Sequence, residues 1–112
     1  LGMQSNLAAE TAALISEMAG VERVAFSNTG TEAIMAAVRI ARSRTKRPKI
    51  VMFSGSYHGT FDGILARVGE DSTSAQPVSL GTPSGMVEDV IVLSYGVEES
   101  LEIIAAHADD LA

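Results

Sequence analysis

The feature that most constrains the fold of this chain is an apolar run, a small polar loop and a helix start over residues 24–31. Residues 24–26 are apolar at successive positions, which is typical of a strand buried on both faces. The next residues, Ser-Asn-Thr-Gly-Thr over 27–31, precede a helical pattern. Backbone N–H groups are free at the start of a helix, and the helix dipole is positive there. The loop is therefore predicted to bind an anion.

A second apolar run opens into a second polar loop further along the chain. Residues 50–53 are apolar, and residues 54–59 read Ser-Gly-Ser-Tyr-His-Gly. This loop offers an aromatic ring and an imidazole beside glycines that allow a ligand to approach closely. In a parallel α/β sheet, the loops after the strands share the edge at which ligands bind. The loops at 27–31, 54–59 and 94–96 are therefore predicted to converge, and the first two together suggest a planar, phosphorylated cofactor.

Periodicity, caps and turn residues predict an α/β chain with a parallel sheet. Thr29 and Glu32 have the spacing of a capping box, which predicts that a helix begins at Gly30. Residues 33–41 are apolar nearly all round, so this helix is predicted to be buried. The strands on either side of it predict a right-handed βαβ unit. The expected helices cover residues 5–19, 30–43, 59–65 and 97–107, the expected strands 21–26, 49–53 and 90–93, and an expected surface loop 67–85.

The composition indicates one globular domain of 112 residues, with 46% hydrophobic and 20% charged residues. The formal net charge of −6 argues against a nucleic-acid partner. No apolar run approaches the roughly 20 residues of a membrane span, and there is no cysteine for a disulfide or thiolate site. The acidic pairs fall on expected loops and helix starts, where solvated carboxylates are common, so no metal site is predicted. We expect a cytoplasmic location.

Four segments of the chain closely resemble the class III aminotransferases, which depend on pyridoxal 5′-phosphate (PLP). The resemblance is greatest to the branch similar to glutamate-1-semialdehyde aminomutase, which includes aminotransferase modules of polyketide and peptide synthetases. It implies that residues 1–112 are a single partial PLP-binding domain, truncated at both ends. This domain would be a fragment of the mostly parallel-sheet large domain of fold type I PLP-dependent enzymes. The four segments are residues 23–33, 37–42, 47–50 and 53–59.

The resemblance implies cofactor-binding roles for five residues. Gly30 and Thr31 would hold the cofactor phosphate through backbone N–H groups and a hydroxyl, with Thr29 beside them. Tyr57 would stack on the pyridine ring, and the adjacent His58 would support the pocket. Thr29 stands where the family commonly has serine, and it keeps the hydroxyl.

The chain lacks two groups that amino transfer by this cofactor requires. The chemistry needs a lysine that forms a Schiff base with the cofactor and a carboxylate that keeps the pyridine nitrogen protonated. The only lysines are Lys46 and Lys49, which are expected at the opposite edge of the sheet. In the family, the required lysine and aspartate lie further downstream. We therefore predict no catalytic residue in this chain, and no transaminase activity for the chain alone.

The full-length parent is predicted to transfer an amino group between an amino donor and an oxo substrate, both small molecules. The resemblance also implies a homodimer. One alternative is an aminomutase parent, which would move an amino group within one molecule. Two others are a non-catalytic module that binds a phosphate ligand and a structural domain in which the two loops are only turns.

Overall fold

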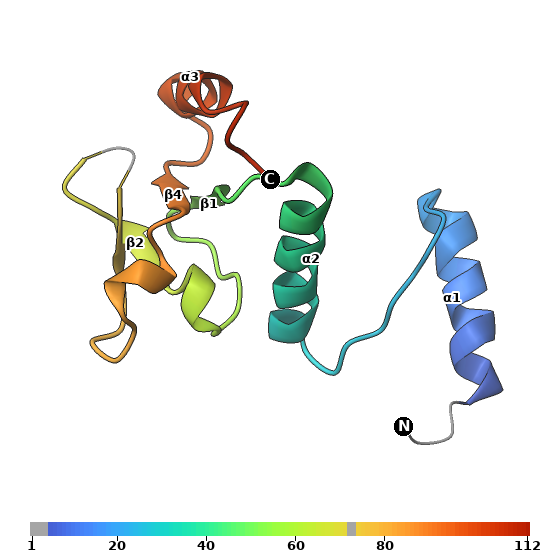
Figure 1. The fold of residues 1–112 in the computed structure, drawn as a ribbon. Coiled ribbons are helices and arrows are strands. Elements are labelled where there is room, and N and C mark those ends of the chain that lie inside the picture. The colour runs from blue at the N-terminus through green and yellow to red at the C-terminus, as the bar shows by residue number, and fades with distance from the viewer. Residues whose placement is uncertain (1–4, 72–73) are drawn as a thin grey trace.

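The computed structural model describes residues 5–71 and 74–112, which form two small sheets and three α-helices (Figure 1). The helices are α1 (Asn6–Ala19), α2 (Gly30–Thr45) and α3 (Glu98–Ala106), and the strands are β1 (Ile50–Phe53), β2 (Ala66–Val68), β3 (Ala75–Pro77) and β4 (Val90–Leu93). Short 3₁₀ turns occupy Asp62–Ile64 and Ser84–Met86. β1 and β4 pair in parallel, whereas β2 and β3 pair antiparallel. The predicted α/β class with a parallel sheet is therefore confirmed.

The hydrophobic core forms around the parallel pair of strands. All four residues of β4 are buried, as expected for a continuous apolar run between two packed layers. Phe53 lies opposite Leu93 at the end of the ladder, and the Ser54 N–H donates to the Leu93 carbonyl oxygen at 2.7 Å. The loops after β1 and β4 therefore leave the sheet from the same edge. The main core cluster contains Met52, Ile64, Val87, Val90 and Val92.

The predicted strand over residues 21–26 is wrong. These residues are extended but have no strand partner among the described residues, and Figure 1 shows them leading from α1 to α2 beside neither sheet. An apolar run becomes a strand only when another backbone accepts and donates its hydrogen bonds. The predicted βαβ unit around α2 is accordingly absent from the described residues. The parallel pair is instead formed by β1 and β4, with the β2–β3 hairpin between them in sequence.

The predicted burial of residues 33–41 is also wrong, because α2 has no buried residue. Its half-buried positions include Thr31, Met35 and Val38, which recur at helical spacing along one stripe, whereas Ile40 is 68% exposed. Val38 of this stripe, together with Ile34, Ala37 and Ala41, faces β1 across a cavity of about 290 Å³. The sequence shows how apolar a helix is, but burial on every side requires neighbours on every side.

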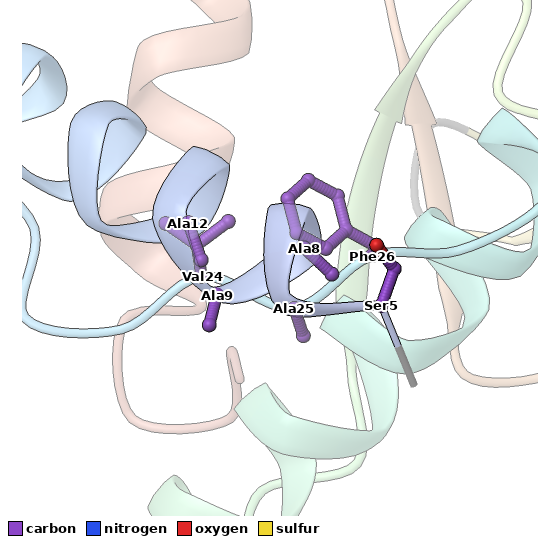
Figure 2. A pocket seen from close by; sticks show the side chains of 7 residues that line it. All are labelled: Ser5, Ala8, Ala9, Ala12, Val24, Ala25 and Phe26. Atoms are coloured by element: carbon purple, nitrogen blue, oxygen red, sulfur yellow. The ribbon is translucent and has the colours of Figure 1, made fainter. Parts of the chain in front are cut away.

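The first helix lies at one end of the molecule, away from the sheets (Figure 1). The radius of gyration is 16.5 Å, above the about 13 Å expected for a compact domain of 100 residues. A groove of about 530 Å³ lies between α1 and residues 24–26. Its lining side chains, which are alanines, Val24, Phe26 and Ser5, are drawn in Figure 2. The groove has no charged lining residue, so it offers little chemistry of its own. None of the described helices combines the length and apolarity of a membrane span.

The predicted surface loop over residues 67–85 contains regular structure that the sequence analysis missed. The hairpin of β2 and β3 pairs Arg67 with Gln76, and the Gly69 N–H donates to the Ser74 carbonyl oxygen at 3.0 Å. Residues 72–73 of the predicted loop lie outside the described residues, as do residues 1–4 of the predicted domain. Strands of three residues between Ser, Gly and Pro are too short to show a clear alternation of apolar and polar positions.

Candidate cofactor site

The start of α2 has the capping geometry that the sequence predicts. Thr29 is the N-cap, and its Oγ1 accepts a hydrogen bond from the Glu32 N–H at 3.2 Å. The Glu32 carboxylate accepts from the Asn28 N–H at 2.8 Å. The first bond of the helical backbone runs from the Ala33 N–H to the Thr29 carbonyl oxygen, at 3.1 Å. Within the described residues, the N–H groups of Gly30 and Thr31 therefore remain available to an anion.

The two predicted loops meet at this helix start. Thr31 Oγ1 accepts a hydrogen bond from the Thr60 N–H at 3.3 Å. Gly59 has a φ of +107°, and a Cβ added there would lie 2.8 Å from Thr31 Oγ1 and 3.0 Å from Thr31 Cα. Only a residue without a side chain permits this approach. The predicted convergence of the first and second loops is therefore confirmed.

The third predicted loop lies beside the second. The rings of Phe53 and Tyr95 meet edge to face, with centroids 5.3 Å apart and an interplanar angle of 87°. The Ser100 hydroxyl donates to the Ser94 carbonyl oxygen at 2.7 Å, which ties this loop to α3. The second and third loops therefore leave the same edge of the parallel pair, whereas the first loop follows no strand of this sheet and reaches the second loop through Thr31.

Tyr57 and His58 lie on different sides of the second loop. The Tyr57 side chain is 80% exposed, and it borders a groove of about 360 Å³ on the side of the β2–β3 hairpin. His58 is half-buried and lines the cavity between α2 and β1, and its buried Nε2 has no hydrogen-bond partner among the described residues. The aromatic ring is therefore available to a ligand, whereas the imidazole supports the loop from behind.

Both lysines lie away from the start of α2. Lys46 forms the C-cap of α2, and a helix of 16 residues is about 24 Å long. Lys49 forms an ion pair with Asp110, with Nζ and Oδ2 3.4 Å apart. The Lys49 ammonium group, followed by His107, lowers the pKa of the Asp110 carboxyl. The structure thus places the lysines where the sequence analysis expects them, at the edge opposite the converging loops.

Two parts of this site were not predicted from the sequence. One is the Thr60 N–H, which donates to Thr31. The other is Arg67, which lines the groove beside Tyr57. The short strand that carries Arg67 has no distinct sequence pattern, and a backbone donor cannot be recognised from residue type. The preference of Gly59 for positive φ was the one available signal that the second loop turns sharply here.

The donors at the start of α2 fit a phosphate monoester. They comprise two free N–H groups, the hydroxyls of Thr29 and Thr31, and the positive end of a helix dipole. A Cβ added at Gly30 would meet no atom within 4 Å, so an oxygen-rich group can approach the backbone there. In the part of the chain that the structure describes, no three potential metal ligands cluster. The arrangement therefore suits an anion held by hydrogen bonds.

A family model and two sequence relatives of this chain indicate the same group of proteins. Residues 2–110 match the family model described as aminotransferase class-III. A glutamate-1-semialdehyde 2,1-aminomutase of Clostridium acetobutylicum is 45% identical over 85 residues, covering 75% of this chain and 20% of the relative. The enzyme of the same name from Cutibacterium acnes is 43% identical over 99 residues, covering 88% and 23%. The chain thus spans about a quarter or less of the length of these relatives.

Solved structures show the same fold. An omega-transaminase from Sphaerobacter thermophilus has a TM-score of 0.84 and 33% identity, covering 99% of this chain and 27% of that protein. A structure described as a transaminase with PLP bound has a TM-score of 0.82 and 36% identity, with the same coverage. The predicted relation to the α/β fold of PLP-dependent enzymes is therefore confirmed. From the extent of the family match, the chain belongs to the class III aminotransferase family.

Proposed function

We propose that this chain forms the phosphate-binding part of a PLP site in a longer enzyme that transfers amino groups. The observation that supports the proposal most directly is the contact of Thr31 with Gly59 and Thr60. This contact lies at the start of α2, where the first backbone N–H groups are available to an anion. This contact joins an anion-binding helix start to a loop with an exposed aromatic ring. The family match and the transaminase structure with PLP bound support the same cofactor.

Three residues of the first loop would hold the cofactor phosphate. The N–H groups of Gly30 and Thr31 would donate to phosphate oxygens, and the Thr31 hydroxyl would donate its own proton while accepting from Thr60. Thr29 would fix the direction of these donors, because its side chain closes the first turn of the helix. The helix dipole adds about half a positive charge at this end.

Tyr57 would position the cofactor ring by stacking on one face of it. Its ring is exposed. The residues two and three positions after it in the loop, Gly59 and Thr60, contact Thr31. When bound, the cofactor supplies an electron sink for bonds at the amino-bearing carbon. The role proposed for the described residues is to bind and orient the cofactor, because both lysines lie beyond the far end of α2. We therefore propose that the reactive lysine belongs to another part of the enzyme and that this chain alone is inactive.

Titration of the full-length protein with PLP and with pyridoxal, which lacks the phosphate, tests this proposal. A charged hydrogen bond contributes about 1.5–3 kcal/mol, so losing two or more should weaken binding by about a hundredfold or more. We expect PLP to bind at least that much more tightly, as measured from the change in cofactor absorbance. Equal affinity for the two compounds would contradict the proposal, because the start of α2 would then hold no phosphate.

An aminomutase is the second candidate function. It is favoured by the relatives named glutamate-1-semialdehyde 2,1-aminomutase, which are 43–45% identical to this chain. The transaminase neighbours are 33–36% identical and favour transfer between two molecules. Both reactions use the same phosphate site. Binding of PLP without either reaction would instead favour the alternative of a non-catalytic binding module, and no binding at all would favour a structural domain.

For the full-length enzyme we also propose that it acts on a small amino-acid or oxo substrate and that it forms a homodimer. The homodimer is supported by the apolar surface that the described residues leave uncovered. Leu7, Leu14 and Met18 of α1 are 60–87% exposed, and Phe26 in the extended segment is 55% exposed. Such surface is commonly covered by further protein. We further propose a cytoplasmic location.

Replacing His58 with leucine is expected to leave PLP affinity within twofold and to keep or raise stability. The His58 Nε2 is buried without a partner, which costs about 1–3 kcal/mol, and leucine fills a similar volume without that cost. Urea unfolding of the full-length protein measures the change. His107→Leu is the matched control, because His107 has a carboxylate partner, with Nδ1 3.6 Å from Asp110 Oδ2. A marked loss of PLP affinity in His58→Leu would show that the imidazole contacts the cofactor.

A further inference from the structure

We propose that Asp62 and Thr82 are positioning residues for the PLP site, because their hydrogen bond holds the loop after β1 against the start of α2. Thr82 Oγ1 donates to Asp62 Oδ1 at 3.2 Å, and the two residues lie 20 positions apart in the chain. This inference rests on the proposed function, since the loop concerned is the one that would carry the stacking ring. It assigns a role to a part of the chain outside the cofactor-binding residues themselves.

Asp62 begins the turn that follows the contact between the loop and Thr31. The Thr60 N–H donates to Thr31 Oγ1 at 3.3 Å, and the 3₁₀ turn Asp62–Ile64 begins two residues later. The last residue of this turn, Ile64, is 3% exposed and belongs to the main core cluster. Asp62 is exposed, so core packing does not fix its side chain. The hydrogen bond from Thr82 therefore fixes the end of the turn that lies nearer to Thr60.

Thr82 is a rigid donor for this bond. Its side chain is 6% exposed, and its backbone N–H donates to the Ser79 carbonyl oxygen at 3.1 Å. The next residue, Pro83, has a fixed φ and precedes the second 3₁₀ turn. Threonine also has few side-chain rotamers, because it is branched at Cβ. A buried hydroxyl normally has a hydrogen-bond partner, and for Thr82 that partner is a carboxylate from the segment that follows the cofactor loop.

The loop after β1 depends on this turn for its placement at α2. Residues 54–57 are all exposed, so the first part of the loop has little packing of its own. The close approach of Gly59 to Thr31 leaves no room for a Cβ, and binding geometries of this kind tolerate displacements of only about 0.5 Å. Movement of the turn at Asp62 would draw Gly59 and Thr60 away from Thr31. The hydroxyl proposed to hold the phosphate would then lose its orienting donor.

Titration of full-length Thr82→Val with PLP and with pyridoxal tests this inference. The variant should bind PLP about threefold to tenfold more weakly, which is the net effect of one hydrogen bond, and pyridoxal within about twofold of the unaltered protein. In the cofactor-free protein, amide hydrogen exchange of a peptide that contains Thr60 should become faster. Thr82→Ser keeps the hydroxyl and should restore both results. Thr45→Val is the matched control, because it removes a hydroxyl that donates to the Ala41 carbonyl oxygen at 2.9 Å, in the last turn of α2.

A double-mutant cycle with Asp62→Ala shows whether the two residues act as a pair. Asp62→Ala should match Thr82→Val, and the double variant should bind PLP no more weakly than either single variant does. Additive losses would overturn the inference.

The remaining outcomes separate this inference from the proposed function. If the unaltered protein binds PLP and Thr82→Val binds it equally well, the inference is overturned and the proposed function stands. Equal losses for PLP and pyridoxal, or an equal loss of PLP affinity in Thr45→Val, also overturn the inference, because they indicate a general effect on the fold. Failure of the unaltered protein to bind PLP overturns the proposed function and this inference with it.

Discussion

Gly59→Ala is expected to lower the free energy of unfolding by about 2–4 kcal/mol and to weaken PLP binding by about tenfold or more. A positive φ alone costs a side chain about 1–2 kcal/mol. At Gly59 the added Cβ would also lie 2.8 Å from Thr31 Oγ1 and 3.0 Å from Thr31 Cα. One of these atoms is backbone, so the helix start and the loop must move apart. The same movement would displace the phosphate donors from Tyr57.

Gly55→Ala is the matched control for this prediction. Gly55 lies in the same loop and has a φ of +79°, but a Cβ added there would meet no atom within 4 Å. Its substitution should therefore cost about 1–2 kcal/mol from backbone strain alone and leave PLP affinity nearly unchanged. Urea unfolding and PLP titration of both variants in the full-length protein separate strain from contact. Equal effects of the two substitutions would show that the approach of Gly59 to Thr31 is unimportant.

The parts of the fold that depend on neighbouring residues were predicted well from the sequence. The start of α2 at Gly30 follows from the Thr29 and Glu32 capping pattern, which acts within one turn. The apolar runs of β1 and β4 were identified because both are short, apolar and bounded by turn residues. The parts that depend on distant partners were not. Residues 21–26 have a strand pattern, but no described segment pairs with them.

In the candidate site too, some features could be predicted from the sequence and others depended on distant partners. The sequence correctly predicted that the first two loops meet, but the reasoning from parallel strands holds only for the second loop, which follows β1. The first loop follows an extended segment with no strand partner among the described residues, and it meets the second loop through Thr31. The partner atoms could not be predicted, since Thr60 contributes only its backbone N–H. The directions of the Tyr57 and His58 side chains could not be predicted from the sequence pattern either. Adjacent residues in an irregular loop have no fixed alternation, and the structure places only the imidazole between α2 and β1.

Thr31→Val is expected to weaken PLP binding by about tenfold to a hundredfold, whereas Thr31→Ser should stay within about threefold. Valine has nearly the shape of threonine but lacks the hydroxyl that would donate to phosphate, and a hydrogen bond to a charged group contributes about 1.5–3 kcal/mol. It also leaves the Thr60 N–H without its acceptor. Serine keeps both interactions. Titration of the full-length variants with PLP measures the difference.

Pyridoxal makes this comparison specific to the phosphate. Because it lacks the group that Thr31 would hold, its affinity should be similar in the unaltered protein, Thr31→Val and Thr31→Ser. A loss that appears for PLP and not for pyridoxal therefore places the hydroxyl at the phosphate. A parallel loss for both compounds would instead mean that valine disturbs the loop through Thr60, which contacts the same oxygen at 3.3 Å. Full PLP affinity in Thr31→Val would remove the Thr31 hydroxyl from the site and leave the backbone N–H groups of Gly30 and Thr31 as the phosphate donors.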